Sequence, residues 1–178
     1  MLSIDDERQA VVAEARSWLR TPYHHMGRIK GAGVDCATLL AEVYARAGVV
    51  PPLEIPFYPP DWHLHKNAER YLDFILAHAQ EIDAIPKPGD VALWRFGKCF
   101  SHGAIVIDWP LVIHAYSGKG CILENAEQAV WLSRLSGKGK GEARPVRFFT
   151  LTRWVEQAAT RRAIKVTLAP ELQSREVD

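Results

Sequence analysis

One stretch near the N-terminus constrains this chain more than any other. Residues 21–48 read TPYHHMGRIKGAGVDCATLLAEVYARAG, in which a polar, glycine-rich loop ends at Asp35 and Cys36 opens an apolar run with helical spacing. A cysteine at this place lies at the positive end of a helix dipole, beside backbone N–H groups that have no partner within the helix. Such a setting lowers a thiol pKa and favours a nucleophile. We therefore expect the rest of the chain to supply what a reactive cysteine needs.

The overall composition excludes several other classes of protein. The 178 residues suit one domain with appendages, and 48% hydrophobic with 24% charged residues is typical of a soluble globular protein. Lys and Arg number 22 against 21 Asp and Glu, which gives no reason to expect a nucleic-acid partner. No apolar run reaches the roughly 18 residues of a membrane span, and the acidic start MLSIDDERQAVV has no apolar signal core. We expect a chain that is cytoplasmic at synthesis and does not insert into membranes.

The three cysteines, Cys36, Cys99 and Cys121, are widely spaced. They form neither a disulfide framework nor a CxxC metal pair, so reduced thiols are expected. Cys99 and Cys121 lack a setting like that of Cys36 and are interpreted as structural. A zinc site built from Cys99, Cys121, His102 and His114 is an alternative, although their spacings match no compact ligand pair. We expect neither a metal nor another cofactor.

Helical spacing dominates the first half of the sequence. Ser3 and Asp6 form a capping pattern ahead of apolar residues at helical intervals, and Thr21-Pro22 ends that run because proline disfavours helix in the residue before it. Asp35 stands where an N-cap carboxylate accepts the first N–H groups of a second helix. We expect helices over about residues 5–19, 36–47 and 66–82, a loop over 23–34 and an irregular proline-rich connection over 49–62.

From Ile85 onward the pattern changes to short β-rich runs separated by turn residues. Residues 102–107 (HGAIVI) and 111–116 (LVIHAY) are joined by a short turn, which is typical of a hairpin. Helices that come first and strands that come second indicate an α+β fold. Further strands are expected over residues 91–94, 121–124 and 146–151, a strand or short helix over 129–132, an exposed loop over 136–142, and a terminal helix over 152–162 before a polar tail.

Two histidines on the expected hairpin could complete a nucleophilic system. His102 opens one strand, and His114 lies near the end of the partner strand, 12 residues later. Antiparallel strands joined by a short turn bring such residues side by side. Attack by a thiolate needs a histidine to take and return the proton, and a third polar group to orient that histidine. One histidine can then face Cys36 while the other holds its ring.

Each of these residues also has a purely structural interpretation. A lone cysteine is usually a small buried hydrophobe, and His102 and His114 could each be retained for packing alone. His24 and His25 form a loop pair that could line a cleft or lie exposed. The glycine-rich approach, the helix start and the paired histidines together favour the reactive interpretation of Cys36.

The order of these motifs resembles a known family. TPY, a glycine-rich loop, DC at a helix start, PGDVALW, SHGAIV and VIHAY are similar to the NlpC-type cysteine peptidases, papain-like bacterial and phage enzymes that cut the peptide stems of peptidoglycan. The similarity covers about residues 10–115. It implies that Cys36 is the nucleophile, His102 the general base and His114 the third polar residue. The residues expected to contact substrate are Tyr23, His24, His25, Asp35 and Ser101.

The resemblance also implies a fold, a domain organisation and a setting. The fold is papain-like, with N-terminal helices and the cysteine at a helix start packed on a central antiparallel sheet. One peptidase domain spans residues 1–151, with a proline-rich insertion at about 50–62, and residues 152–178 form a terminal helix and tail. The stretch RIKGAGVDCATLLAEVYARAG is most similar to the branch encoded with phage and prophage tail genes. That branch implies a tail-associated cell-wall hydrolase, with stem peptides as substrate and tail proteins as partners.

The sequence departs from the family pattern in the loop and just after the cysteine. Ala37-Thr38 replaces a frequent Ser-Gly, and His24 to Gly27 replaces paired glycines after Tyr23. These departures concern the details of the substrate more than the triad.

Three alternatives to the peptidase stay open: a non-catalytic tail module on the same fold, an amidase or acyltransferase with the same triad, and a zinc protein.

Overall fold

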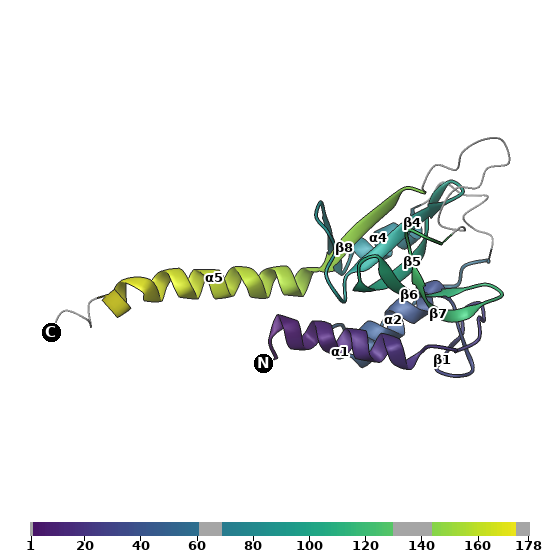
Figure 1. Ribbon diagram of the computed structural model, residues 1–178, viewed down its shortest axis with the longest axis horizontal. Coiled ribbons are helices and arrows are strands. Elements are labelled where there is room, and N and C mark those ends of the chain that lie inside the picture. Colours follow the sequence, from purple (N-terminus) through teal and green to yellow (C-terminus); the bar gives the residue numbers. More distant parts are fainter. Residues whose placement is uncertain (1, 61–68, 130–143, 174–178) are drawn as a thin grey trace.

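Residues 2–60, 69–129 and 144–173 are described in the computed structural model of the chain, in which helices pack on an antiparallel sheet (Figure 1). The six-stranded sheet has the order β3-β8-β4-β5-β6-β7. Its strands are β3 (Ala79–Ile82), β4 (Val91–Phe96), β5 (Cys99–Asp108), β6 (Leu111–Tyr116), β7 (Gly120–Asn125) and β8 (Val146–Leu151). The helices in these residues are α1 (Ile4–Ser17), α2 (Cys36–Arg46), α4 (Arg70–Leu76) and α5 (Thr152–Gln173), and β1 (Arg28–Ile29) pairs with β2 (Gly33–Val34) in a small hairpin. The expected α+β fold is confirmed.

Both N-terminal helices begin where the sequence predicts, because each has a complete capping box. Ser3 Oγ accepts from the N–H of Asp6, while the Asp6 carboxylate accepts from the N–H of Ser3. At α2, the Asp35 side chain accepts from the N–H groups of Ala37 and Thr38, and the Thr38 hydroxyl accepts from the N–H of Asp35. These contacts span only three residues, which explains why the sequence alone locates both helix starts.

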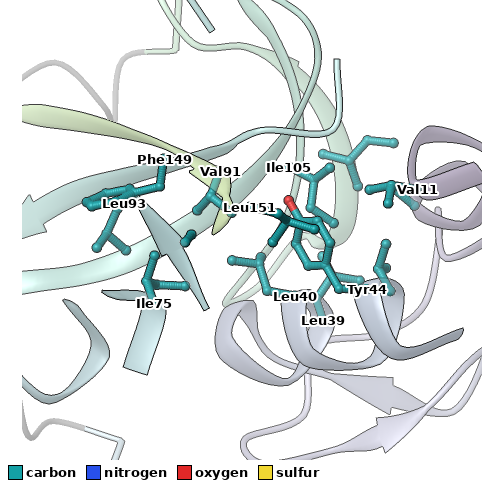
Figure 2. Packing of buried hydrophobic residues seen from close by; sticks show 14 of the residues in the cluster. Val11, Leu39, Leu40, Tyr44, Ile75, Val91, Leu93, Ile105, Phe149 and Leu151 are labelled. Carbon is teal, nitrogen blue, oxygen red and sulfur yellow. The ribbon is translucent and has the colours of Figure 1, made fainter. Parts of the chain in front are cut away.

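The main core lies between the helices and one face of the sheet. Leu39, Leu40 and Val43 of α2 are at most 3% exposed and pack towards the sheet. Figure 2 shows this packing, in which residues from α1, α2, α4 and the sheet converge: Val11, Leu39, Leu40, Tyr44, Ile75, Val91, Leu93, Ile105, Phe149 and Leu151. Burying each large aliphatic side chain contributes about 1.5–3 kcal/mol. This burial fixes α2, and with it Cys36, against the sheet.

The expected hairpin of β5 and β6 is confirmed. Ile105 pairs with Ile113 and Val106 with Val112, in an antiparallel register. β4 pairs with the other side of β5, with Trp94 opposite His102 and an irregularity between Trp94 and Arg95. The register therefore places the start of β5, which carries His102, beside the end of β6, which carries His114.

The helix predicted over residues 66–82 is wrong at its C-terminal end. α4 ends at Leu76, and residues 79–82 form β3, which pairs with β8 from Phe148 to Leu151. Within β3, Ala79 is buried while Gln80 and Glu81 are exposed. Backbone hydrogen bonds to β8 outweigh the helical propensity of AQEI, a tertiary effect that local spacing cannot predict. Residues 66–68 lie outside the described residues.

Other predicted boundaries shift by smaller amounts. The loop predicted over residues 23–34 contains the β1–β2 hairpin, and the terminal helix extends to Gln173 rather than 162. Ala129 lies outside any strand or helix, while residues 130–132 and the predicted loop over 136–142 lie outside the described residues. The strands expected over residues 91–94, 121–124 and 146–151 are all present, the first two of them longer than predicted.

A polar clasp joins α5 to α1. Glu7 is 4% exposed, and its carboxylate accepts from Trp154 Nε1 at 2.7 Å and from Arg153 Nη2 at 2.6 Å. Beyond this first turn α5 projects away from the sheet (Figure 1). None of the helices in the described part of the chain has the length and apolar composition of a membrane span.

Candidate active site

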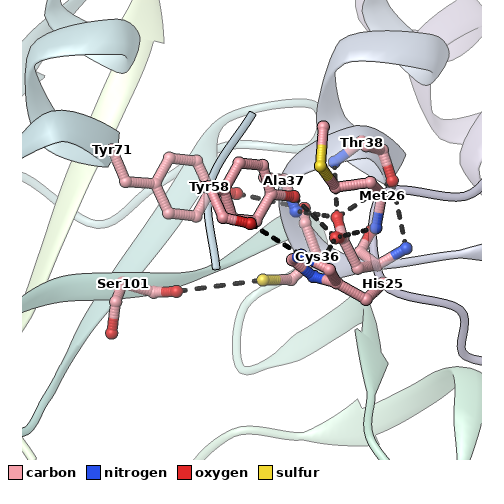
Figure 3. A network of polar contacts seen from close by, with 9 residues as sticks. His25, Met26, Cys36, Ala37, Thr38, Tyr58, Tyr71 and Ser101 are labelled. Carbon is pink, nitrogen blue, oxygen red and sulfur yellow. Dashed lines mark hydrogen bonds and ion pairs between the residues drawn. The ribbon is translucent and has the colours of Figure 1, made fainter. Parts of the chain in front are cut away.

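Cys36 is the first residue of α2, and its sulfur lies against the backbone of β5. Cys36 Sγ is 3.8 Å from the carbonyl oxygen of Ser101. Figure 3 marks this contact with a dashed line. Ser101 immediately precedes His102 in the chain. Packing of α2 on the sheet thus brings the sulfur to the strand backbone beside the predicted general base.

Opposing influences determine the pKa of the Cys36 thiol. Burial raises this pKa most, and the negative charge of Asp35 raises it further. Backbone N–H groups of Gly103, Cys36 and Ala37 act in the lowering direction that a helix start predicts. Burial prevails, and the pKa is raised to about 12. The expected lowering is therefore wrong for this arrangement, because desolvation outweighs the helix amides and keeps the thiol protonated at neutral pH.

Tyr71 of α4 packs against the strand segment that follows His102. Its hydroxyl donates to the carbonyl oxygen of Cys36 at 3.0 Å, and its side chain is buried. A Cβ atom at position 103 would lie 2.3 Å from Tyr71 Oη and 2.9 Å from its Cζ atom. Gly103 therefore allows α2, α4 and β5 to meet at the cysteine.

Three adjacent strands contribute a chain of side chains behind the predicted base. His102 Nε2 of β5 lies 3.1 Å from His114 Nδ1 of β6. His114 Nε2 lies 3.2 Å from Glu124 Oε2 of β7, and Lys119 Nζ lies 3.3 Å from the other oxygen of Glu124. The two histidines are side by side, as the hairpin pattern predicts, and a carboxylate follows them.

The protonation of His114 determines which nitrogen of His102 can act as a base. Burial lowers the pKa of His114 to about 4, although Glu124 acts in the raising direction, so the ring is neutral near pH 7. A carboxylate can only accept, so Nε2 of neutral His114 carries the hydrogen and donates to Glu124. His114 Nδ1 then accepts from Nε2–H of His102, which leaves the lone pair of the His102 ring on Nδ1.

Aromatic rings surround His102 and limit its movement. Its ring centroid lies 5.2 Å from that of Phe96, 6.3 Å from that of Trp94 and 5.9 Å from that of Tyr116. The residue is only 7% exposed. Apolar surroundings of this kind strengthen the bond to His114, because water competes little for its partners.

The Asp35 carboxylate is almost wholly buried at 1% exposure and accepts on both oxygens. Oδ1 accepts from the backbone N–H groups of the first turn of α2. Oδ2 accepts from the N–H of Met26 at 2.7 Å and from Tyr58 Oη at 2.6 Å. His25 Nδ1 lies 3.5 Å from the same oxygen. Figure 3 shows this network around the first turn of α2. Asp35 therefore joins the glycine-rich loop, the proline-rich segment and the cysteine helix.

The structure brings most of the predicted substrate-contacting residues towards Cys36. Tyr23 is half-buried, and burial together with the nearby charges of Cys36 and Asp35 raises its pKa. His25 reaches Asp35, and Ser101 directs its carbonyl oxygen at the sulfur. His24 differs, because it is exposed and packs on Gly33, where a Cβ atom would lie 2.6 Å from its own. Contact of these residues with a substrate stays a prediction.

Cys99 and Cys121 are buried in the sheet region, and neither is disulfide-bonded. Burial raises the pKa of Cys121 to about 12, a value typical of an unreactive thiol. Within the described ranges, no three His, Cys, Asp or Glu side chains are grouped so that they could hold a metal ion.

Three residues of the site escaped the sequence analysis: Tyr58, Tyr71 and Glu124. Glu124 had a usable signal, because β6 and β7 form a tight hairpin in which residue 124 lies diagonally opposite His114. Tyr71 falls within the helix predicted over residues 66–82, where nothing in the sequence distinguishes it from a packing residue. Tyr58 had no local signal, since its partner Asp35 lies 23 residues away and the intervening segment is irregular.

Comparison with known proteins shows the fold. No protein-family model matches the sequence, and no curated protein matches it. The NlpC/p60 domain of the peptidoglycan hydrolase SagA superposes with a TM-score of 0.50 at 21% identity, over 79% of this chain and 96% of that domain. NlpC2 from Trichomonas vaginalis gives 0.55 at 15% identity, over 84% of this chain but only 50% of NlpC2.

A third structure with this fold has no catalytic function. RipD from Mycobacterium tuberculosis, a non-catalytic NlpC/p60 domain protein adapted to peptidoglycan binding, gives a TM-score of 0.50 at 13% identity, over 81% of this chain and 96% of RipD. The chain therefore has the papain-like α+β fold of NlpC/p60 domains, and this fold occurs both with and without hydrolase activity.

Proposed function

We propose that this chain is a cysteine peptidase that hydrolyses amide bonds in the stem peptides of peptidoglycan. The observation that carries the proposal is the placement of Cys36 Sγ at the start of α2, against the backbone beside His102, whose ring is held by His114. The fold shared with the NlpC/p60 domain of a peptidoglycan hydrolase supports the substrate class.

Proton transfer from the thiol is the first step of the proposed mechanism. The Sγ proton passes to Nδ1 of His102, because the bond to His114 places the lone pair on that nitrogen. The thiolate then attacks the carbonyl carbon of the scissile amide. A general base is needed here because the thiol, with a pKa of about 12, does not ionise unaided at neutral pH. General-base catalysis of this kind contributes about 10²–10⁴-fold.

Collapse of the intermediate completes the reaction. The developing oxyanion would be stabilised by backbone N–H groups at Cys36 and by the Tyr23 hydroxyl. His102 returns its proton to the leaving amine as the C–N bond breaks, which leaves an acyl-thioester on Cys36. His102 then takes a proton from water, the hydroxide attacks the thioester, and the thiol is regenerated. Throughout, His114 holds the ring of His102 in one tautomer.

A non-catalytic wall-binding module is the second candidate. The raised pKa of Cys36 favours it, because a thiol that stays protonated at neutral pH is typical of an unreactive cysteine. RipD shows that the same fold exists without activity. In that case Cys36 and its partners would serve packing, and stem peptides would be bound without turnover.

A digest of purified peptidoglycan, read by mass spectrometry, separates the two candidates. We expect wild type to release stem-peptide fragments and Cys36→Ala to lose about 10³-fold or more of that rate. Cys121→Ala is the matched control, since it removes a buried thiol outside the site and should keep the activity. Absence of fragments from folded wild type, with retained binding to peptidoglycan, would establish the non-catalytic module instead.

We also propose that the enzyme works as part of a phage or prophage tail and reaches the cell wall in the virion. The support is the similarity of RIKGAGVDCATLLAEVYARAG to the tail-gene branch of these peptidases. Mass spectrometry of purified particles from the source strain tests the association. Detection with the tail proteins is expected, and recovery only from the particle-free cell extract would contradict it.

A further inference from the structure

The proline-rich segment 51–60, which we call the strap, is hydrogen-bonded to residues at and near the start of α2. Proline occupies five of its ten positions, which fixes φ there and lowers the entropy that the segment loses on ordering. Arg28 Nη2 donates to the carbonyl oxygen of Leu53 at 2.9 Å, while Arg28 Nε donates to Glu42 of α2 at 2.8 Å. One end of the strap is therefore tied to the cysteine helix through Arg28.

Tyr58 ties the other end of the strap at the helix start itself. Its hydroxyl donates to Asp35 Oδ2 at 2.6 Å, a bond to a charged and buried acceptor. His25 Nε2 lies 2.7 Å from the carbonyl oxygen of Tyr58, and the two rings meet edge to face with centroids 4.9 Å apart. The neighbouring Phe57 is 75% exposed, so this end of the strap is held through Tyr58 and its contacts rather than by general burial.

The Tyr58 side chain also lies close to the thiol. Burial raises its pKa most, followed by the charge of Asp35 and the bond to it, and the charges of Cys36 and Tyr23 raise it further. Figure 3 shows Tyr58 and Tyr71 together at the start of α2, on the side where Cys36 opens the helix. Cys36 itself is only partly exposed. The Tyr58 end of the strap is therefore held beside the residue that opens α2.

We propose that Tyr58 is a specificity-determining residue: its bond to Asp35 holds the strap beside Cys36 and limits the size of the acyl group that reaches the thiol. The role of Tyr58 in substrate selection rests on the proposed function, whereas its effect on access to the thiol does not. A slim, linear peptide would reach Cys36 with the strap in place, whereas a branched or cross-linked stem would be admitted only when the Tyr58–Asp35 bond opens.

Alkylation of Cys36 by reagents of two sizes tests this directly. The second-order rate constants for iodoacetamide and for fluorescein-5-maleimide are measured by peptide mass mapping in the full chain. The ratio of the small-reagent to the large-reagent rate constant reports the size limit. Tyr58→Phe removes the hydrogen bond that holds the strap, so the large reagent should reach Cys36 more easily and its rate constant should rise. We therefore expect the ratio to fall about tenfold in Tyr58→Phe, and further in Tyr58→Ala.

Phe57→Ala is the matched control, because it removes an exposed aromatic ring from the same strap and should leave the ratio at the wild-type value. An unchanged ratio in Tyr58→Phe, with native circular dichroism, overturns the proposal even if Tyr58→Ala does not fold. Alkylation needs no turnover, so it tests the strap independently of the peptidase activity. If the ratio falls in Tyr58→Phe while wild type does not digest peptidoglycan, the size limit set by the strap is supported and the peptidase function is rejected.

Discussion

The reactivity of Cys36 depends on two groups of contacts that act in opposite directions. The N–H groups at the helix start stabilise a thiolate, while burial and Asp35 destabilise it, and burial is the larger effect. The proposed chemistry therefore relies on His102 removing the proton during attack rather than on a standing thiolate. His114 and Glu124 matter for the same reason, because they keep the basic lone pair on His102 Nδ1.

The pH profile of Cys36 alkylation follows from this residue-scale balance. With a pKa raised to about 12, only the thiolate fraction reacts, so the iodoacetamide rate should rise about tenfold per pH unit from about pH 7 to 10. Peptide mass mapping at each pH measures the rate at Cys36 separately from Cys99 and Cys121. A plateau beginning near neutral pH would contradict the prediction and indicate a thiolate already paired with an imidazolium.

At the scale of elements, the site exists because α2 and α4 meet β5 at one point, while the strap is held at the start of α2. The phenol of Tyr71 packs directly against the backbone of Gly103, so α4 and β5 cannot move closer together without a steric clash. β3, which comes shortly after α4 in the chain, pairs with β8 at the opposite edge of the sheet from β7. The helix α5 begins directly after β8. The geometry at Cys36 is thus sensitive to substitutions that touch neither the thiol nor the histidines.

Gly103→Ala tests this contact. The added Cβ would lie 2.3 Å from Tyr71 Oη, so overpacking should lower the free energy of unfolding by about 1–3 kcal/mol. Urea denaturation of Gly103→Ala, Tyr71→Phe and the double variant gives a double-mutant cycle. Removal of the hydroxyl should relieve part of the clash, so the double variant should be more stable than the sum of the single effects predicts. Strict additivity would show that the two residues do not compete for one space.

At the scale of the whole molecule, one clasp and one buried histidine link distant parts of the chain. Glu7 and Trp154 join α1 to α5 across 147 residues. His114 lies on β6, next to the edge strand β7, with no exposed surface, and burial favours the neutral form of its ring. Stability of the fold should therefore depend on pH through a residue of the site.

Acid should destabilise the protein through His114. Its folded pKa of about 4 lies below the ordinary value of 6.5, so the unfolded chain binds a proton that the native chain does not. The stability associated with neutral His114 is complete above about pH 6.5 and falls as the pH decreases to about 4, by about 3 kcal/mol in total. Urea unfolding of wild type and His114→Asn between these pH values measures this. A slope as steep in His114→Asn as in wild type would assign the effect to other groups.

Local chemistry in the sequence determined where the helices start and which residues pair on the hairpin. Asp35 caps α2 within three residues, and one short turn brings His102 beside His114, so both features follow from nearby residues alone. The sequence also indicated the α+β class, because the change from helical to alternating spacing is a local property.

Tertiary structure alone decided the protonation of the thiol, the strand at residues 79–82 and the roles of Tyr58 and Tyr71. Each depends on a partner far along the chain: β5 and Tyr71 contact Cys36, β8 converts residues 79–82 to a strand, and Asp35 holds Tyr58. Desolvation and long-range pairing depend on how the whole chain packs. A helix start can therefore be predicted from a few residues, whereas the pKa of the cysteine that opens it cannot.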